Sequence, residues 1–391
     1  MLQDRVQALL DDMIWQNALP CCSVLVLHKG EEVLYAQAGL ADREKQIPLS
    51  RNHLFRLFSM SKPITAVAAM ILVEEGKLSL AEVVKYYLPG FENLQVWDGT
   101  QLVKTKRELL VWDLLHMSCG LPYPGFSNVS DRATGKVFEQ ILPEQLTTQE
   151  VANRFGQCPM LFHPRDSFVY GVSTDIMGAV IEAASGMRFG EFLKKRIFEP
   201  LGMEDTGFWV PPEKQHLLTK TYGRTPEGTW VEDTQVKLAI SVTMDQPPRF
   251  ESGGAGLVGS IDDYAKFGAM LLNGGTLNGH RILSSRTVKM MEKEDLFMPE
   301  LVVFGHDAPG YSYGSFMRHR NSDVMPEILA SKGEYGWGGA LATWFSNSPE
   351  EGVTMVMMTQ KGYAGFDVWT DVRGRLYNLI MSDPEMEARF A

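Results

Sequence analysis

The chain has 391 residues, of which 45% are hydrophobic, and a formal net charge of −11 at pH 7. This apolar content is enough for one large core or for two lobes. The acidic charge argues against nucleic acid or an anionic membrane surface as the main partner. No run approaches the ~20 apolar residues that a membrane-spanning helix needs.

The N-terminal region predicts a helix followed by a strand pair. Residues 2–15 have the spacing of an amphipathic helix, without the basic start and apolar centre of a signal peptide. We therefore expect a cytoplasmic location, unless a leader has been removed. Residues 23–28 and 32–38 read as two strands around a turn at 29–31.

The most informative stretch is Ser59-Met60-Ser61-Lys62, which follows an extended approach over residues 52–58. Pro63 is tolerated only in the first turn of a helix, so Ser59 should lie at or next to a helix N-terminus. Lys62 then follows one turn later on the same face. This places an amine within reach of a hydroxyl proton, at the positive end of a helix dipole.

Ser-x-x-Lys is weak evidence alone, because a chain of this length contains about one by chance. Residues 59–203 otherwise show mainly helical patterns, with a long loop at 118–136. Near the end of this region Tyr170 lies on a turn-rich loop, just before an apolar helix at 174–184. We predict that this phenol is displayed at a second helix entrance.

The C-terminal half predicts short strands and two helices. Strands are expected near Trp230, Leu238 and Leu257, and helices at 261–272 and 368–381. The glycine-rich segment 335–340 should lead into a strand at 341–346, with another strand at 353–358. Glycines at a strand start allow another backbone or a ligand to approach closely.

With these motifs in this order, the chain resembles the serine β-lactamase and penicillin-binding-protein superfamily. Within it, the class C β-lactamase-like branch is closest, and family VIII carboxylesterases above all. Further stretches agree with that branch: Leu114-Leu115-His116-Met117-Ser118-Cys119-Gly120-Leu121, Gly253-Gly254-Ala255-Gly256-Leu257, Leu271-Leu272-Asn273-Gly274-Gly275 and Arg281-Ile282-Leu283-Ser284. The resemblance covers about residues 5 to 380.

The resemblance implies an α/β (α+β) fold, in which an antiparallel sheet is flanked by helices and a mainly helical lobe is inserted. The patterns along the chain assign residues 1–58 and 205–391 to the sheet lobe and 59–204 to the helical lobe. Ser59 then falls at the junction, where a cleft would form.

Two departures from the family bear on the activity. β-Lactamases of this branch have Lys-Thr-Gly where this chain has Trp337-Gly338-Gly339, and Tyr-x-Asn or Tyr-x-Ser where it has Tyr170-Gly171-Val172. Tryptophan has no positive charge for a substrate carboxylate, and offers an apolar wall and one N–H donor. Uncharged acyl substrates are therefore favoured over anionic lactams.

The expected site follows from these residues. Ser59 would be the nucleophile of an acyl-enzyme, and either Lys62 with a lowered pKa or a Tyr170 phenolate would be the base. By resemblance, the backbone N–H groups of Ser59 and Ala340 would form the oxyanion hole. The expected substrate contacts are Trp337, Gly338, Gly339, Tyr123 and Phe58. Core packing is the alternative for Trp337, and a turn residue is the alternative for Tyr123.

Three functions remain open on the sequence. The first is a serine carboxylesterase acting on small uncharged esters. The second is an acyltransferase, a D-amino peptidase or a weak β-lactamase with the same acyl-enzyme, and the third is a catalytically silent binding protein. Four cysteines and eight histidines show no zinc spacing. We expect free thiols, no metal and no cofactor. The expected partner is a small acyl substrate, without nucleic acid or membrane, and the sequence leaves the oligomeric state open.

Overall fold

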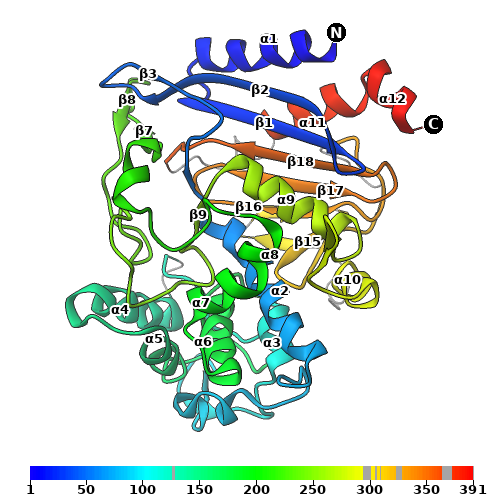
Figure 1. Cartoon of the computed structure of the whole chain (residues 1–391). Helices are drawn as coiled ribbons and strands as arrows, with labels where there is room; N and C mark the ends of the chain where they lie inside the picture. Colours follow the sequence, from blue (N-terminus) through cyan, green and yellow to red (C-terminus); the bar gives the residue numbers. More distant parts are fainter. Residues whose placement is uncertain are drawn as a thin grey trace.

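The computed structural model describes residues 1–125, 128–293, 301–303, 306–308, 310–322, 328–362 and 372–390. Figure 1 shows a large sheet with helices on both of its faces and a mainly helical region beneath it. Both chain termini lie on the far side of the sheet from the helical region.

The sheet has eight strands in the order β14-β15-β16-β17-β18-β1-β2-β3, and neighbouring strands run antiparallel. Ser23 pairs with Met358, so the two ends of the chain build one sheet. This confirms the predicted fold class. The bounds are β1 Cys21–His28, β2 Glu31–Asp42, β3 Ile47–Pro48, β14 Tyr311–Gly314, β15 Met317–Arg320, β16 Tyr335–Gly338, β17 Trp344–Ser348 and β18 Val353–Met358.

Both faces of the sheet are buried, and the side chains of β18 alternate between two cores. Met355 and Met357 join the outer cluster, with residues of α1 (Leu2–Trp15) and α11 (Arg373–Met381). Val356 and Met358 join the large inner core, as does α9 (Ile261–Leu272). Because successive strand residues point to opposite faces, a strand covered on both sides is mostly apolar, and the polar Thr354 of β18 is hydrogen-bonded to Asn347.

The inserted region is mainly helical, and α2 packs against α6 at its centre. The large inner core continues without a break from the sheet into these helices. The proposed lobe boundaries at residues 58 and 205 therefore stay a prediction. The helices are α2 Ser61–Glu74, α3 Val111–Leu115, α4 Val129–Glu144, α5 Thr148–Phe155, α6 Ser173–Ser185, α7 Phe189–Leu193 and α8 Glu199–Leu201.

Short hairpins and helices complete the described chain. The two-stranded pairs are β4 Phe55–Arg56 with β9 Val258–Gly259, β5 Gln95–Trp97 with β6 Leu102–Lys104, β7 Tyr222–Arg224 with β8 Trp230–Glu232, β10 Thr276–Leu277 with β11 His280–Arg281, and β12 Leu301–Val303 with β13 His306–Ala308. The remaining helices are α10 Ser285–Met291 and α12 Pro384–Phe390.

Three sequence predictions were wrong. The expected loop at 118–136 contains the start of α4, where the Asn128 side chain caps the helix by accepting from Asp131 N–H. No strand forms at Leu238, which lies in a turn between Lys237 and Ile240. The strand predicted at 341–346 begins only at Trp344, as β17, and most of the glycine-rich segment before it forms a separate strand, β16.

Other predicted elements agree closely with the structure. The helices at 2–15 and 261–272 and the strand at 353–358 have the predicted bounds. The last helix begins at Arg373 within the described residues, so the predicted start at Val368 lies outside them. All four cysteines are buried and free. Among the described helices, none combines the length and apolarity required to cross a bilayer.

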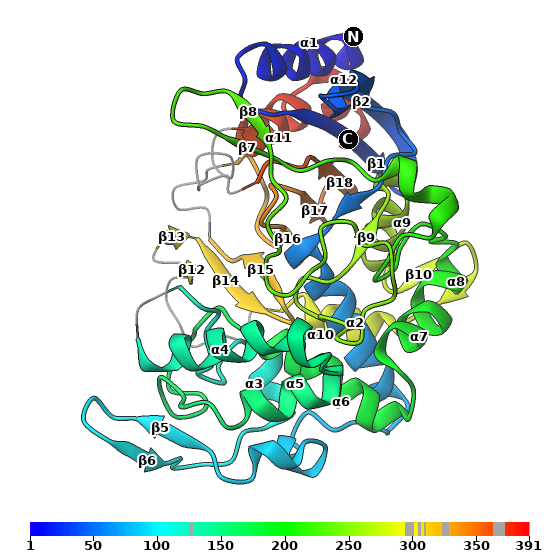
Figure 2. The same ribbon diagram turned by 90° about the vertical axis from the view of Figure 1, so that its left-hand side faces the viewer.

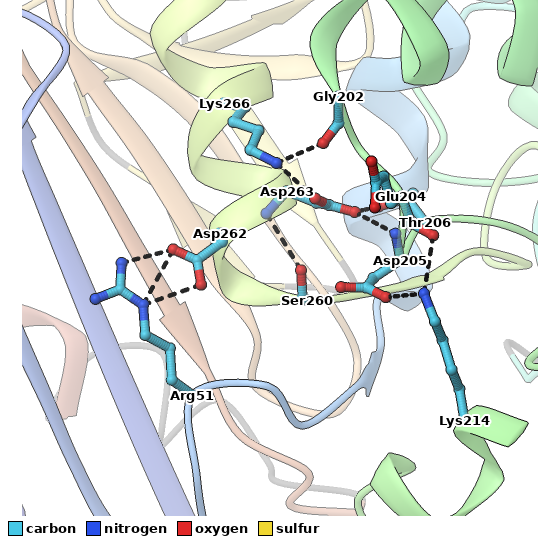
Figure 3. A network of polar contacts seen from close by, with 10 residues as sticks. All are labelled: Arg51, Gly202, Glu204, Asp205, Thr206, Lys214, Ser260, Asp262, Asp263 and Lys266. Carbon is cyan, nitrogen blue, oxygen red and sulfur yellow. Dashed lines mark hydrogen bonds and ion pairs between the residues drawn. The ribbon is translucent and has the colours of Figure 1, made fainter.

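Helix α9 packs on the sheet, and hydrogen bonds from its first turn connect it to the segment that follows α8 (Figure 3). The Asp263 carboxylate is 2% exposed and accepts from Asp205 N–H at 2.8 Å and from the Thr206 hydroxyl at 3.0 Å. Lys266 pairs with the same carboxylate at 3.2 Å. The neighbouring Asp262 instead pairs with Arg51 at the surface. Two adjacent carboxylates therefore have very different surroundings.

We expect Asp263→Asn to lower the free energy of unfolding by about 1–3 kcal/mol, because the amide cannot accept from all the buried donors. Asp262→Asn, which breaks an exposed ion pair, should cost less than about 1 kcal/mol. Urea unfolding of the two variants measures the difference. Equal effects at both positions would contradict the role given to Asp263.

Candidate active site

Ser59 lies on a single 3-10 turn, Phe58–Met60, directly before α2. Strand β4, which pairs with β9, directly precedes this turn. Leu57 N–H then donates to Leu257 O at 2.9 Å. Phe58 has φ of 45°, in the left-handed region that costs a non-glycine residue about 1–3 kcal/mol. The strained residue turns the chain into α2. The predicted position of Ser59 next to a helix N-terminus is thus observed.

Lys62, in the first turn of α2, has its ammonium group next to the serine. Lys62 Nζ lies 3.2 Å from Ser59 Oγ, 3.2 Å from the Tyr123 hydroxyl and 2.7 Å from Gly254 O. The side chain is fully buried. Burial lowers the pKa of Lys62 to about 7, although the Asp175 carboxylate acts in the opposite direction.

A buried carboxylate lies behind this amine. Asp175, in the first turn of α6, is 1% exposed and accepts from Tyr123 O–H through Oδ2 at 3.1 Å. Its Oδ1 accepts from Ser252 O–H at 2.5 Å and from Gly254 N–H at 3.1 Å. Burial raises the pKa of this carboxyl, whereas Lys62 and the three hydrogen-bond donors lower it. Its oxygens thus have three donors within the protein.

Tyr170 contacts the serine from the other side. The Trp337 indole N–H donates to the Tyr170 hydroxyl at 3.1 Å, and the two ring centroids are 5.5 Å apart. Burial raises the pKa of Tyr170 well above its usual range, and hydrogen bonds with Ser59 and Trp337 lower it only in part. Near neutral pH Tyr170 is therefore a neutral phenol.

Trp337 is both packed and hydrogen-bonded. Its side chain is 2% exposed and meets Tyr313 edge to face, with ring centroids 5.1 Å apart. Tyr313 in turn packs against Phe168 at 5.2 Å. An aromatic layer thus begins at Tyr170 and continues away from the serine. Trp337 is therefore packed in the core, and its indole also donates a hydrogen bond.

Glycine at the residue that follows β16 allows the chain to approach Leu57, just before the Ser59 turn. A Cβ at Gly339 would lie 2.4 Å from Leu57 O, and one at Gly338 would lie 2.9 Å from the guanidinium of Arg373. The Thr343 hydroxyl also donates to Leu57 O at 3.3 Å. Close backbone approach was the reason given for glycine here, and Leu57 is the segment approached. Ala340 follows directly and is exposed.

The N–H groups around Ala340 are mostly occupied. Gly339 N–H donates to Thr343 O at 2.8 Å, and Ala342 N–H donates to Gly339 O at 3.0 Å. Within the described parts of the chain, no carbonyl oxygen accepts from Ala340 N–H. This N–H is thus available beside the serine turn, as an oxyanion donor requires.

The structure gives the surroundings of two predicted substrate contacts, Tyr123 and Phe58, whose contact with substrate stays a prediction. Tyr123 contacts Lys62 and Asp175, so it belongs to the polar network rather than to a turn surface. Phe58 packs in a small apolar cluster with Ile240 and Leu341. Its contact with an acyl group stays a prediction.

Sequence reasoning missed Asp175, Ser252 and the function of the Gly254 backbone. One signal was present, since Asp175 is an acidic residue directly before the apolar run 176–181 of the same helix. Acidic side chains are almost never fully buried unless they are paired. No comparable signal identifies Ser252, which lies in a glycine-rich loop. Among the described residues, no group of three or more His, Cys, Asp or Glu has the arrangement of a metal site.

Comparisons with known proteins agree with this geometry. The family model described as Beta-lactamase matches residues 2–376. Esterase EstB of Burkholderia gladioli is 29% identical over 381 residues, which cover 93% of this chain and 92% of EstB. The structure of EstCE1, a hydrolase with promiscuous acyltransferase activity, aligns over 100% of this chain and 98% of its own with a TM-score of 0.80 and 23% identity.

A second solved structure has the same fold. Unliganded simvastatin synthase (LovD) from Aspergillus terreus aligns over 99% of both chains, with a TM-score of 0.79 and 19% identity. These structures support the fold, and the family model supports the membership. The chain belongs to the Beta-lactamase family and has the fold of its serine hydrolases.

Proposed function

We propose that this protein is a serine carboxylesterase that acts on small, uncharged esters through an acyl-enzyme at Ser59. The observation that supports it best is the 3.2 Å contact between Ser59 Oγ and a fully buried Lys62 amine. Since the pKa of Lys62 is lowered to about 7, much of this amine is neutral near pH 7 and can accept a proton.

In the proposed reaction, Ser59 Oγ attacks the ester carbonyl carbon while its proton moves to Lys62 Nζ. The N–H groups of Ser59 and Ala340 stabilise the oxyanion, and such a donor typically contributes roughly 3–4 kcal/mol. The C–O bond to the alcohol then breaks, and the departing alkoxide takes a proton from Tyr170. The Lys62 N–H that faced Ser59 Oγ turns to the oxygen of Tyr170, whose ring lies 4.8 Å from Nζ, and returns the proton. Water repeats the sequence to release the acid and free Ser59.

The geometry favours Lys62 over Tyr170 as the base. A phenol whose pKa is raised by burial holds its proton near neutral pH, and a neutral indole N–H stabilises a phenolate less than a lysine ammonium would. Tyr170 thus supplies a proton to the leaving group. This proposal gives the two groups different functions, although their protonation is coupled.

Acyl transfer is a second candidate, because an alcohol can intercept the same acyl-enzyme. The observation in its favour is the aromatic layer of Trp337 and Tyr170, which places apolar surface rather than charge next to the serine. EstCE1 is described as a hydrolase with promiscuous acyltransferase activity. The ratio of ester to acid formed with an added alcohol distinguishes the two reactions.

Wild-type protein should hydrolyse a short p-nitrophenyl ester, and Ser59→Ala should lose at least about 1,000-fold in kcat/KM, because the nucleophile is absent. A fluorophosphonate should add covalently to Ser59 in the wild type only, as measured by intact mass. Ser61→Ala is the matched control, since Ser61 Oγ accepts from Leu257 N–H rather than facing Lys62. No Ser59-dependent adduct and no turnover would favour a silent binding protein.

The pH dependence of kcat/KM should show an acidic limb near pH 7. The base must be deprotonated, so activity is present above the pKa of Lys62 and is lost as the pH falls through about 7. Rates measured in constant-ionic-strength buffers between about pH 5 and pH 9 test this. An acidic limb below about pH 5 would point to a carboxylate base instead.

Trp337→Lys should shift the substrate preference from esters towards anionic lactams, because it adds a positive charge beside Tyr170. Hydrolysis of a chromogenic cephalosporin relative to the p-nitrophenyl ester measures the shift. Trp337→Phe is the control that removes the N–H donor and adds no charge. An unchanged ester-to-cephalosporin ratio in Trp337→Lys would mean that this position does not select substrate charge.

A further inference from the structure

We infer that Asp175 is a positioning residue, which acts through Tyr123 to direct the lone pair of the neutral Lys62 amine at Ser59. The inference rests on the proposed function, in which Lys62 is the base. It adds two residues to the machinery and assigns each a definite hydrogen-bonding role.

The first step is the orientation of the Tyr123 hydroxyl. A carboxylate only accepts hydrogen bonds, so the contact of 3.1 Å between Tyr123 and Asp175 Oδ2 must use the tyrosine hydrogen. The other oxygen of Asp175 is occupied by Ser252 O–H and Gly254 N–H. Tyr123 therefore presents its oxygen to Lys62 only as an acceptor.

The second step is a count of the hydrogens on Lys62. A neutral amine has two N–H groups and one lone pair. Gly254 O at 2.7 Å and the Tyr123 oxygen at 3.2 Å are both acceptors, and they take the two N–H groups. The remaining direction is that of Ser59 Oγ at 3.2 Å. The lone pair therefore points at the hydroxyl whose proton it must remove.

The protonated state fits the same arrangement. After Lys62 takes the serine proton, its three N–H groups point at Gly254 O, the Tyr123 oxygen and Ser59 Oγ, and no side chain has to move. The rings of Tyr123 and Tyr170 lie 5.1 Å and 4.8 Å from Nζ, and the charged group that acts on it is Asp175. Both protonation states are thus accommodated.

Gly254 links Asp175 and Lys62 through its backbone. Its N–H donates to Asp175, and its carbonyl accepts from Lys62. A Cβ at this position would lie 2.3 Å from the Tyr123 hydroxyl and 2.9 Å from Asp175 Oδ2. Only glycine fits here, so the backbone, the carboxylate and the phenol form one packed unit around the amine.

Asp175→Asn should reverse the direction of the hydrogen bonds from residue 175 through Tyr123 to Lys62, with almost no change in side-chain shape. The amide oxygen must face the two donors Ser252 and Gly254, so the NH₂ group faces Tyr123. Tyr123 then accepts from Asn, and its own hydrogen turns to Lys62. The lone pair of Lys62 is then occupied by Tyr123 and no longer serves Ser59.

We expect Asp175→Asn to lower kcat for the p-nitrophenyl ester by roughly 100-fold or more, the size of a lost general base. Its acidic limb should move to lower pH, because a negative charge that raises the pKa of Lys62 is removed. Tyr123→Phe should lose about tenfold, as one hydrogen bond to a charged group does. The double variant should be no slower than Asp175→Asn, since both changes act on one chain of contacts.

Asp263→Asn is the matched control, because it also changes a buried carboxylate that accepts a backbone N–H. It should lower the melting temperature and leave kcat and the acidic limb unchanged. A residual rate in Asp175→Asn within about threefold of wild type, with the same acidic limb, would overturn the inference. Losses that multiply in the double variant would also overturn it.

The two proposals fail in different ways. Without a Ser59-dependent adduct in the wild type, the proposed function itself fails. If the wild type forms that adduct and turns over the ester, a normal rate in Asp175→Asn contradicts only the positioning role of Asp175. If Asp175→Asn does not fold, Tyr123→Phe tests the inference by itself. A tenfold loss in kcat at an unchanged melting temperature supports the inference, and a wild-type kcat overturns it.

Discussion

The burial of one primary amine is the constraint on which the site depends. Burying an ammonium group away from water costs free energy. The polar atoms near Lys62 must therefore either stabilise its charge or hydrogen-bond to its neutral amine. The contacts come from distant parts of the chain, namely the Ser59 turn, the loop of Tyr123, the start of α6 and the glycine loop at 254. The network is therefore a meeting point of the helical region with the strand pair β4–β9.

The indole at position 337 changes how protons are shared. A cation at this position would favour a tyrosine phenolate, whereas a neutral N–H donor leaves Tyr170 as a phenol. In the proposed mechanism, acid and base are then different residues, Tyr170 and Lys62, although Lys62 Nζ lies only 4.8 Å from the Tyr170 ring. This division suits an alcohol leaving group, which needs a proton as it departs.

The sequence predicted much of this site, and the reasons are local. Ser59 and Lys62 lie in one helical turn, and Pro63 fixes where that turn begins. The helix at 261–272 was predicted with correct bounds because Ser260 caps it and its apolar residues have a helical period.

The failures share the opposite property. Asp175 meets Tyr123 and Ser252 through contacts of more than 50 residues in sequence separation, which no local pattern encodes. The glycine-rich segment 335–340 was predicted only as the lead into a strand, because glycines lower strand propensity, whereas the close approach of Gly336 to Phe345 O explains glycine inside β16. The start of α4 was missed because proline and glycine precede its Asn128 cap.

The pairing of β1 with β18 has a consequence for biosynthesis. The hairpin of β1 and β2 leaves the ribosome long before β18, so one edge of β1 has no partner until residues 353–358 have been translated. At about 5–20 residues per second, this interval lasts on the order of tens of seconds. Throughout it, a nearly continuous apolar strand is exposed and open to pairing with another nascent chain. Protection of this hairpin during translation therefore influences the yield of active protein.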